Sequence, residues 1–205
     1  MFPAGYELKA NHPVKNTPGV IIRKECIPQL LKRRDVKKLL HINSARTDPR
    51  LVSTEAYQRL FKGYYKVRRG RQFTEPYLHL LQHDLELRTT PSLKTIVLQS
   101  PEQTGQRHLS FASKLLATLD DTEPLYDQNV CSLLGVPHHH LKGSDWLERA
   151  EERIRLLKQG VADITSASSW PSHEAAFNTA FPEALQLSSQ RKADLMTWAS
   201  SSKTR

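Results

Sequence analysis

The sequence of 205 residues has few of the features that mark an exported, membrane-spanning or disulfide-bonded protein. No apolar run approaches the ~18–20 residues that a helix needs to cross a bilayer. The first seven residues lack the charged-then-apolar layout of a signal peptide. Cysteine occurs only twice, as Cys26 and Cys131, which lie far apart and outside any CxxC-like pair. We therefore expect a cytoplasmic protein without a membrane segment, in which both thiols only pack.

The sequence also lacks long β-branched runs, which are the usual signal for strands. Only residues 20–22 and 95–98 form such runs, and both are short. Apolar residues instead recur at helical spacing along most of the chain. Residues 1–26 show little periodicity and contain Pro3, Pro13 and Pro18, which favours an extended segment. The sequence therefore predicts an all-α fold, with an extended N-terminal arm over 1–26 and one compact multi-helix domain over 27–205.

Complete catalytic motifs are absent as well. No GxxxxGK[ST], GxGxxG or GxSxG occurs, which argues against kinases, dehydrogenases and α/β-hydrolases. Ser110 and Ser113 lie near Lys114, but an SxxK motif would need serine at the position of Phe111. We therefore expect none of these activities and no cofactor.

Two groups of histidines resemble metal ligands but lack the required pattern. His79 and His83 are four residues apart on a predicted helix, yet Leu80 stands where the HExxH motif needs glutamate. The histidines at 138–140 are adjacent, so their side chains diverge and favour a loop. The sequence predicts no metal site.

The whole chain has a formal net charge of +9. Its positive charge is concentrated in the first third of the sequence. Residues 1–75 hold 17 Lys and Arg against 6 Asp and Glu, whereas residues 76–205 hold 13 against 15. A one-sided positive surface attracts polyanions, so the distribution indicates a nucleic-acid partner. The alternative is a solvated basic face that only keeps the protein soluble.

The most basic predicted helix covers residues 28–41. Leu30, Leu31, Val36, Leu39 and Leu40 approximate helical spacing on one side. Five cations occupy the remaining surface and are candidate phosphate contacts: Lys32, Arg33, Arg34, Lys37 and Lys38.

A second basic cluster follows a predicted aromatic helix. Ser53 is expected to cap this helix, and Gly70 is expected to end it. Its aromatic stripe is more often core, but Tyr64 and Tyr65 run directly into a cluster of cations, which suits a base stacked beside phosphates. The same cluster also suits an ordinary helix C-terminus, whose dipole favours cations. The candidate contacts here are Tyr64, Tyr65, Arg68, Arg69 and Arg71.

The rest of the chain is predicted as further helices. One begins at Thr74 and ends before Pro91, and a short piece at 92–98 leads to a turn at 100–105. A buried helix at 109–119 precedes a short one that Asp127 caps. The remaining helices are expected to run from about residue 144 to a stop at Gly160, and over 172–181 and 190–199.

The succession of turn, buried helix, second turn and capping aspartate resembles the helix-hairpin-helix DNA glycosylases over about residues 98–135. Asp127 looks like that family's aspartate, and His108, nineteen residues earlier, stands where bifunctional members place a lysine. Only Gly105 represents the hairpin glycines. Because the lysine is missing, Schiff-base lyase chemistry is not expected.

The resemblance implies hydrolysis of an N-glycosidic bond in DNA by water. Asp127 would stabilise positive charge on the sugar and orient water, with His108 nearby and Tyr64 or Tyr65 stacked on an extruded base. Three alternatives remain open. In the first, Asp127 only caps a helix. In the second, the protein binds nucleic acid without catalysis, and in the third its basic helix binds an acidic protein.

Overall fold

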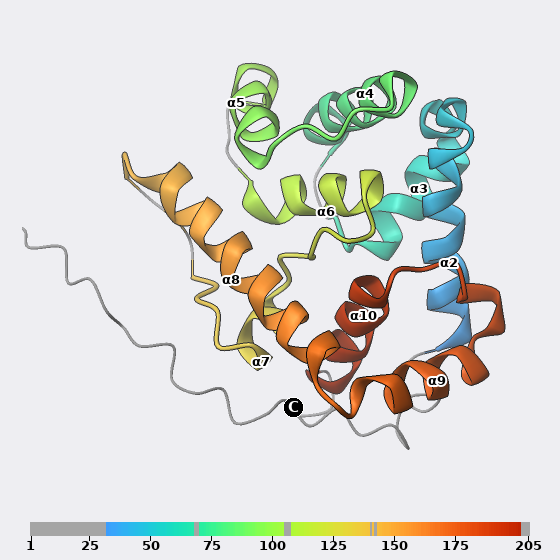
Figure 1. Ribbon diagram of the computed structural model, residues 1–205. Helices are drawn as coiled ribbons and strands as arrows, with labels where there is room; N and C mark the ends of the chain where they lie inside the picture. Colours follow the sequence, from blue (N-terminus) through green and yellow to red (C-terminus); the bar gives the residue numbers. More distant parts are fainter. Residues whose placement is uncertain (1–31, 68–69, 105–107, 140, 142, 202–205) are drawn as a thin grey trace, which may run out of the picture.

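The computed structural model describes residues 32–67, 70–104, 108–139, 141 and 143–201, and every regular element in these ranges is helical (Figure 1). The predicted all-α class is therefore confirmed for this part of the chain. No helix within it combines the length and apolar character that a membrane span needs. The predicted arm lies outside the described residues.

In chain order the elements are α2 (Arg33–Asn43), η2 (Ser44–Arg46), η3 (Pro49–Ser53), α3 (Glu55–Tyr64), α4 (Arg71–Leu87), α5 (Leu93–Thr104), α6 (Leu109–Leu119), α7 (Gln128–Leu133), α8 (Trp146–Ser166), α9 (Trp170–Ala180), η4 (Pro182–Ala184) and α10 (Ser189–Ser201), where η marks a 3-10 turn.

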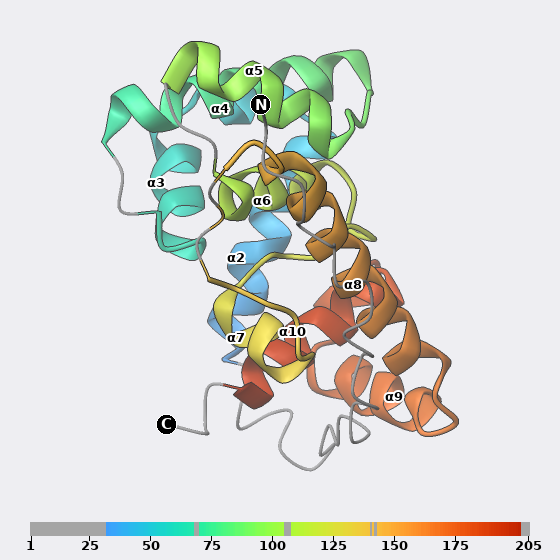
Figure 2. The same ribbon diagram turned by 90° about the vertical axis from the view of Figure 1, so that its left-hand side faces the viewer.

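The helix α6 forms the centre of the molecule. Helices α4 and α5 lie on one side of it, α2 and α3 at one end, and α8 and α10 on the remaining sides (Figures 1 and 2). A helix that is covered all round must be apolar all round. Most of α6 has that composition, and its buried residues are Leu109, Phe111, Ala112, Ser113, Leu115, Leu116, Ala117 and Thr118. Ser110 and Lys114 are half-buried.

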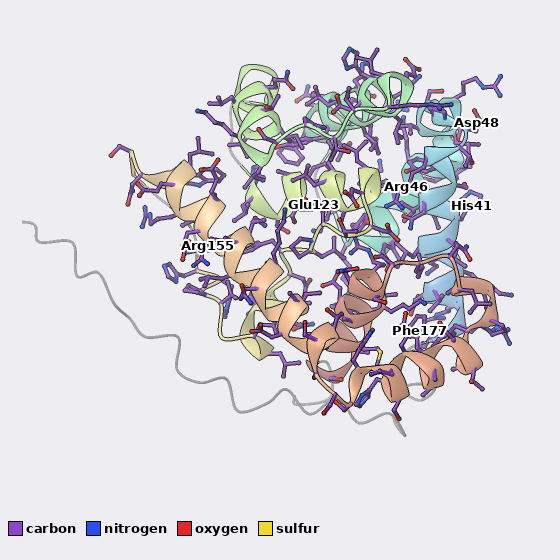
Figure 3. The ribbon with its side chains drawn as sticks, in the orientation of Figure 1. His41, Arg46, Asp48, Glu123, Arg155 and Phe177 are labelled. Atoms are coloured by element: carbon purple, nitrogen blue, oxygen red, sulfur yellow. The ribbon has the colours of Figure 1, made fainter. Side chains whose placement is uncertain are left out.

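Two arginines from distant parts of the chain cap the C-terminus of α6. Arg46 donates from Nε to the carbonyl of Thr118 at 2.6 Å and from Nη2 to that of Ala117 at 3.0 Å. Arg191 also donates to the carbonyl of Ala117, at 3.1 Å. In Figure 3, Arg46 lies between α2 and the end of α6. These cations satisfy helix-end carbonyls and oppose the negative end of the helix dipole.

The starts of α3 and α4 differ from the sequence predictions. Thr54, not Ser53, caps α3, because the Thr54 hydroxyl accepts the backbone N–H of Tyr57 at 3.2 Å. Gly70 does not end a helix but is the N-cap of α4, which begins at Arg71. The chain leaves α3 at Tyr64 and turns at Lys66, whose φ is 52°.

Two other helices continue past their predicted ends. Helix α5 runs to Thr104, through the turn predicted at 100–105. Helix α8 passes Gly160 and ends at Ser166. A Cβ at Gly160 would lie 3.1 Å from Cδ1 of Leu134, so this glycine lets α8 approach the end of α7. The glycine therefore serves packing between helices and not helix termination.

Candidate functional site

A pocket of about 140 Å³ lies at the N-terminus of α6. The first turn of α6, the loop after α7 and the first turns of α8 meet there, and the N-terminus of α6 faces the N-terminal half of α8 (Figures 1 and 2). Leu109, Leu141 and Trp146 supply its apolar wall. Its polar lining consists of His108, Ser110, Tyr126, His138, His139 and Arg153.

Arg153 is the buried cation of this pocket, with only 5% of its surface exposed. Its Nη1 donates to the hydroxyl of Tyr126 at 2.7 Å and to the carbonyl of His139 at 2.6 Å. Its Nη2 lies 3.1 Å from Nε2 of His139. A guanidinium only donates, so Nε2 accepts and the neutral His139 ring carries its proton on Nδ1.

The charge of Arg153 has no ionised partner among the described residues. The other cations of α8 each pair with a carboxylate, at 2.8 Å for Arg149, 2.7 Å for Arg155 and 2.6 Å for Lys158. For Arg153, no described carboxylate oxygen lies within 4 Å, and its three partners are neutral. A buried charge is costly without a counter-charge, so the pocket wall carries uncompensated positive charge.

A second cation, Lys114, lies behind the pocket wall. Its Nζ donates to Oγ of Ser110 at 3.1 Å, one helical turn back on α6. Burial lowers the pKa of Lys114, and the nearby charge of Asp127 opposes that shift. The amine of Lys114 therefore loses its proton more readily than an exposed lysine.

The two predicted catalytic residues differ in their relation to the pocket. His108 lines it as the N-cap of α6 and packs edge-on against Phe73, with ring centroids 4.7 Å apart. Asp127 is half-buried and is not among the lining residues, although its neighbour Tyr126 is. Its Oδ1 accepts the backbone N–H of Asn129 at 2.8 Å, which makes Asp127 the predicted N-cap of α7. The cap is confirmed, whereas a catalytic role stays a prediction.

Part of the predicted basic surface is neutralised by long-range and local ion pairs. Arg33 holds Glu183 with two hydrogen bonds of 2.7 and 2.9 Å, and the guanidinium lowers the pKa of that carboxyl to about 2. Asp35 lies 3.8 Å from Arg34 and 3.5 Å from Lys38. The other two candidate phosphate contacts of the predicted basic helix, Lys32 and Lys37, are exposed. Neither has a carboxylate oxygen within 4 Å in the part of the chain that is described.

The second predicted cluster is only partly described. Arg71 is exposed at the start of α4 and lies 3.5 Å from Glu75, while Arg68 and Arg69 fall outside the described residues.

Of the two tyrosines predicted to stack on a base, Tyr65 lies in the core, and Tyr64 is half-buried at its edge. Tyr65 is 6% exposed, and its hydroxyl lies 3.3 Å from Oγ1 of Thr118. Its ring packs edge-on against Phe61, with centroids 4.8 Å apart. Tyr64 is half-buried against the core, 4.9 Å from the ring of Tyr65, and burial raises the pKa of both hydroxyls. The buried ring of Tyr65 therefore offers no face to a base, because the aromatic stripe of α3 fills the space beside α6.

The two histidines on α4 lie at the surface of the protein. His79 and His83 are both exposed. Within the described ranges, no group of three or more His, Cys, Asp or Glu side chains is placed to hold a metal ion.

Two residues of the site, Arg153 and Lys114, were not predicted as functional. The signal for Arg153 is a charge within the apolar stripe of α8, between Ala150 and Leu157. The signal for Lys114 is its spacing of four residues from Ser110, which places both on one face of a helix.

No protein-family model, curated protein or solved structure matches this chain. The chemistry of the site therefore rests on its own residues. They combine a buried guanidinium, a hydroxyl bonded to an ammonium, and imidazoles at a helix N-terminus, all of which favour a negatively charged ligand.

Proposed function

We propose that the protein binds nucleic acid, and DNA in particular, through the exposed face of α2. The observation that carries this proposal is the pair Lys32 and Lys37, two exposed cations with no carboxylate oxygen within 4 Å among the described residues. They lie in the third of the chain where Lys and Arg outnumber Asp and Glu by 17 to 6. Exposed ammonium groups bind phosphates and release condensed counterions, which makes such binding strong at low salt.

The test is a salt titration of binding to labelled single-stranded and duplex DNA, followed by fluorescence anisotropy. Lys32→Ala/Lys37→Ala should make the slope of log K against log salt shallower by ~1.8 on duplex DNA, because each phosphate contact contributes ~0.9. The matched control is Arg88→Asn/Lys94→Ala, which removes the same charge from exposed positions around the start of α5. Asparagine suits residue 88 because its φ is 53°.

The control variant should keep the parental slope. Absence of DNA binding even at low salt would overturn the proposal and would favour the alternative of an acidic protein partner. That alternative also predicts that DNA competes poorly for the site at physiological salt.

A second candidate function is base excision, as the resemblance to the helix-hairpin-helix glycosylases implies. The observation that favours it is that His108 and Tyr126 line one pocket, with Asp127 next in the chain. Water would bond to the sugar carbon as the N-glycosidic bond breaks and the base leaves with a proton. An ionised Asp127 would stabilise the positive charge that develops on the sugar.

Asp127→Asn separates catalysis from capping. Asparagine is as good an N-cap as aspartate, so the fold should keep its stability while the carboxylate is lost. Base release from DNA that carries damaged bases should disappear in this variant. Asp127→Ala should in addition lose ~0.5–2 kcal/mol of stability. If the parent releases no base, or if Asp127→Asn releases it at the parental rate, the catalytic proposal is wrong.

A further inference from the structure

We propose that the pocket at the N-terminus of α6 is a binding site for a phosphate group, held by Arg153. This site is separate from the surface of α2 and does not depend on the proposed nucleic-acid binding.

The first argument is the charge balance around Arg153. Arg153 as a residue is only 5% exposed, and it lines the pocket. The structure gives Nη2 one neighbour, the imidazole of His139, whereas this nitrogen carries two hydrogens. Arginine recognises phosphate through such donors, and an anion in the pocket would supply the missing counter-charge.

The second argument is the asymmetry of α6. Its C-terminus already has two cations, because Arg46 and Arg191 bind the carbonyls of its last turn. Its N-terminus, by contrast, has no acidic residue in the first turn. The first N–H groups of a helix have no intrahelical acceptor, and the positive end of the dipole attracts anions. Leu109 and Ser110, the first two residues of this helix, line the pocket.

The third argument is the composition of the wall. None of the described residues that line the pocket is acidic, and the hydroxyl of Ser110 connects it to the ammonium of Lys114. Burial lowers the pKa of Lys114, and a bound anion would stabilise the protonated amine. The guanidinium of Arg153 on the wall and the ammonium of Lys114 behind it therefore favour an anion, whereas Asp127, the carboxylate near Lys114, is not among the lining residues.

The size of the pocket limits the ligand. Its volume is about 140 Å³, close to the ~150 Å³ of an engineered cavity that accepts benzene. A phosphate group fits this space, and a longer molecule that carries the phosphate can extend past the exposed His138 and His139 at its edge. The ligand is therefore either free phosphate or a terminal phosphate on a longer molecule.

The deciding variant is Ser110→Asp, which places a carboxylate beside Lys114 and in the pocket. Aspartate is favourable near a helix N-terminus, so we expect this variant to fold with parental or higher stability. Ser110→Asn is the matched control, because it has the same size without the charge. Isothermal titration with inorganic phosphate should show saturable binding to the parent and to Ser110→Asn. Ser110→Asp should weaken that binding by at least about tenfold, because the added carboxylate repels the phosphate and pairs with the ammonium of Lys114.

A second variant, His138→Ala, covers the case in which Ser110→Asp does not fold. His138 lines the pocket but is exposed, so its loss should leave the fold intact and weaken phosphate binding several-fold. Two DNA strands that differ only in a 5′-phosphate or 5′-hydroxyl identify the source of the phosphate. Tighter binding of the 5′-phosphorylated strand indicates a nucleic-acid end, and equal binding indicates free phosphate. No saturable phosphate binding to the parent, or parental affinity in both the folded Ser110→Asp and His138→Ala proteins, would overturn the proposal.

Discussion

Arg191 and Asp194 form an ion pair inside the protein, where their side chains are 0% and 3% exposed. Arg191 Nη1 lies 2.8 Å from Asp194 Oδ2, and Nη2 donates to the carbonyls of Ala117 and Glu123. Removal of one partner leaves the other as an uncompensated buried charge. Arg191→Ala should therefore lower the free energy of unfolding by ~3–5 kcal/mol, measured by urea denaturation at pH 7.5. The control Arg155→Ala breaks an exposed pair on the outer side of α8 (Figure 3) and should cost at most ~1 kcal/mol.

The loss in Arg191→Ala should depend on pH. Burial raises the pKa of Asp194 to about 6, above the value of 3.8 for a free side chain. A group whose pKa is raised on folding contributes stability below its unfolded pKa, and this contribution is lost as pH rises through the folded value. Without Arg191, the carboxyl should take up a proton still more readily. The deficit should therefore be smaller at pH 5 than at pH 7.5, and an equal deficit at both pH values would contradict this account.

At the scale of single elements, two neighbouring residues, Ser53 and Thr54, are candidates for the N-cap of α3. Thr54 accepts the N–H of Tyr57, whereas the Ser53 hydroxyl donates to the carbonyl of Arg50. Thr54→Ala should lose ~0.5–2 kcal/mol of stability because a helix N–H loses its acceptor. Ser53→Ala should change it by ~0.5 kcal/mol or less, as exposed substitutions usually do. Thermal unfolding of the two variants measures the difference, and a larger loss in Ser53→Ala would restore the sequence-based assignment.

Helix α8 provides a test of packing against helix propensity. Alanine is ~1 kcal/mol better than glycine inside a helix, so Gly63→Ala, with nothing within 4 Å of the added Cβ, should stabilise α3. Gly160→Ala should instead destabilise the protein by ~1–3 kcal/mol, because its Cβ would press on Leu134. In a Leu134→Ala background the same substitution should gain stability relative to that background. A double-mutant cycle in urea checks this, and additive effects would show that the contact is not the cause.

The same elements show why helix ends were predicted less well than helices. The interior of α6 was predicted because apolar residues recur at helical spacing from 109 to 119. Glycine, by contrast, has several local uses: Gly70 starts α4 and Gly160 relieves a contact with α7. Which use applies depends on a neighbouring helix that the local sequence does not contain.

At the scale of the whole molecule, the central position of α6 should control the order of opening. Most of this helix is buried, so its amides should exchange with solvent only when the protein unfolds as a whole. We expect native-state hydrogen exchange to give α6 amides a free energy equal to that of global unfolding, and the exposed turns of α9 a lower one. Exchange of α6 at lower free energy than its neighbours would contradict this central role.

The candidate site shows the same division between local and long-range information. The cap at Asp127 follows from its position before α7, and its confirmation needed only local contacts. The placement of His108 and Tyr126 in one pocket required α6 and the loop before α7 to meet. The burial of Tyr65 likewise required α3 to pack against α6, which a one-dimensional stripe of aromatics does not specify.

By itself, the sequence determined the helical class, the interior of most helices and the excess of positive charge in the first third, because periodicity, capping and composition are local properties. Only the tertiary structure decided which positive charges are paired with a carboxylate and which can still attract an anion. It pairs Arg33 with Glu183, 150 residues away, and it buries Arg153 among neutral partners. The electrostatic effect of a side chain depends on its distance to other charges and on its exposure to water, and folding sets both.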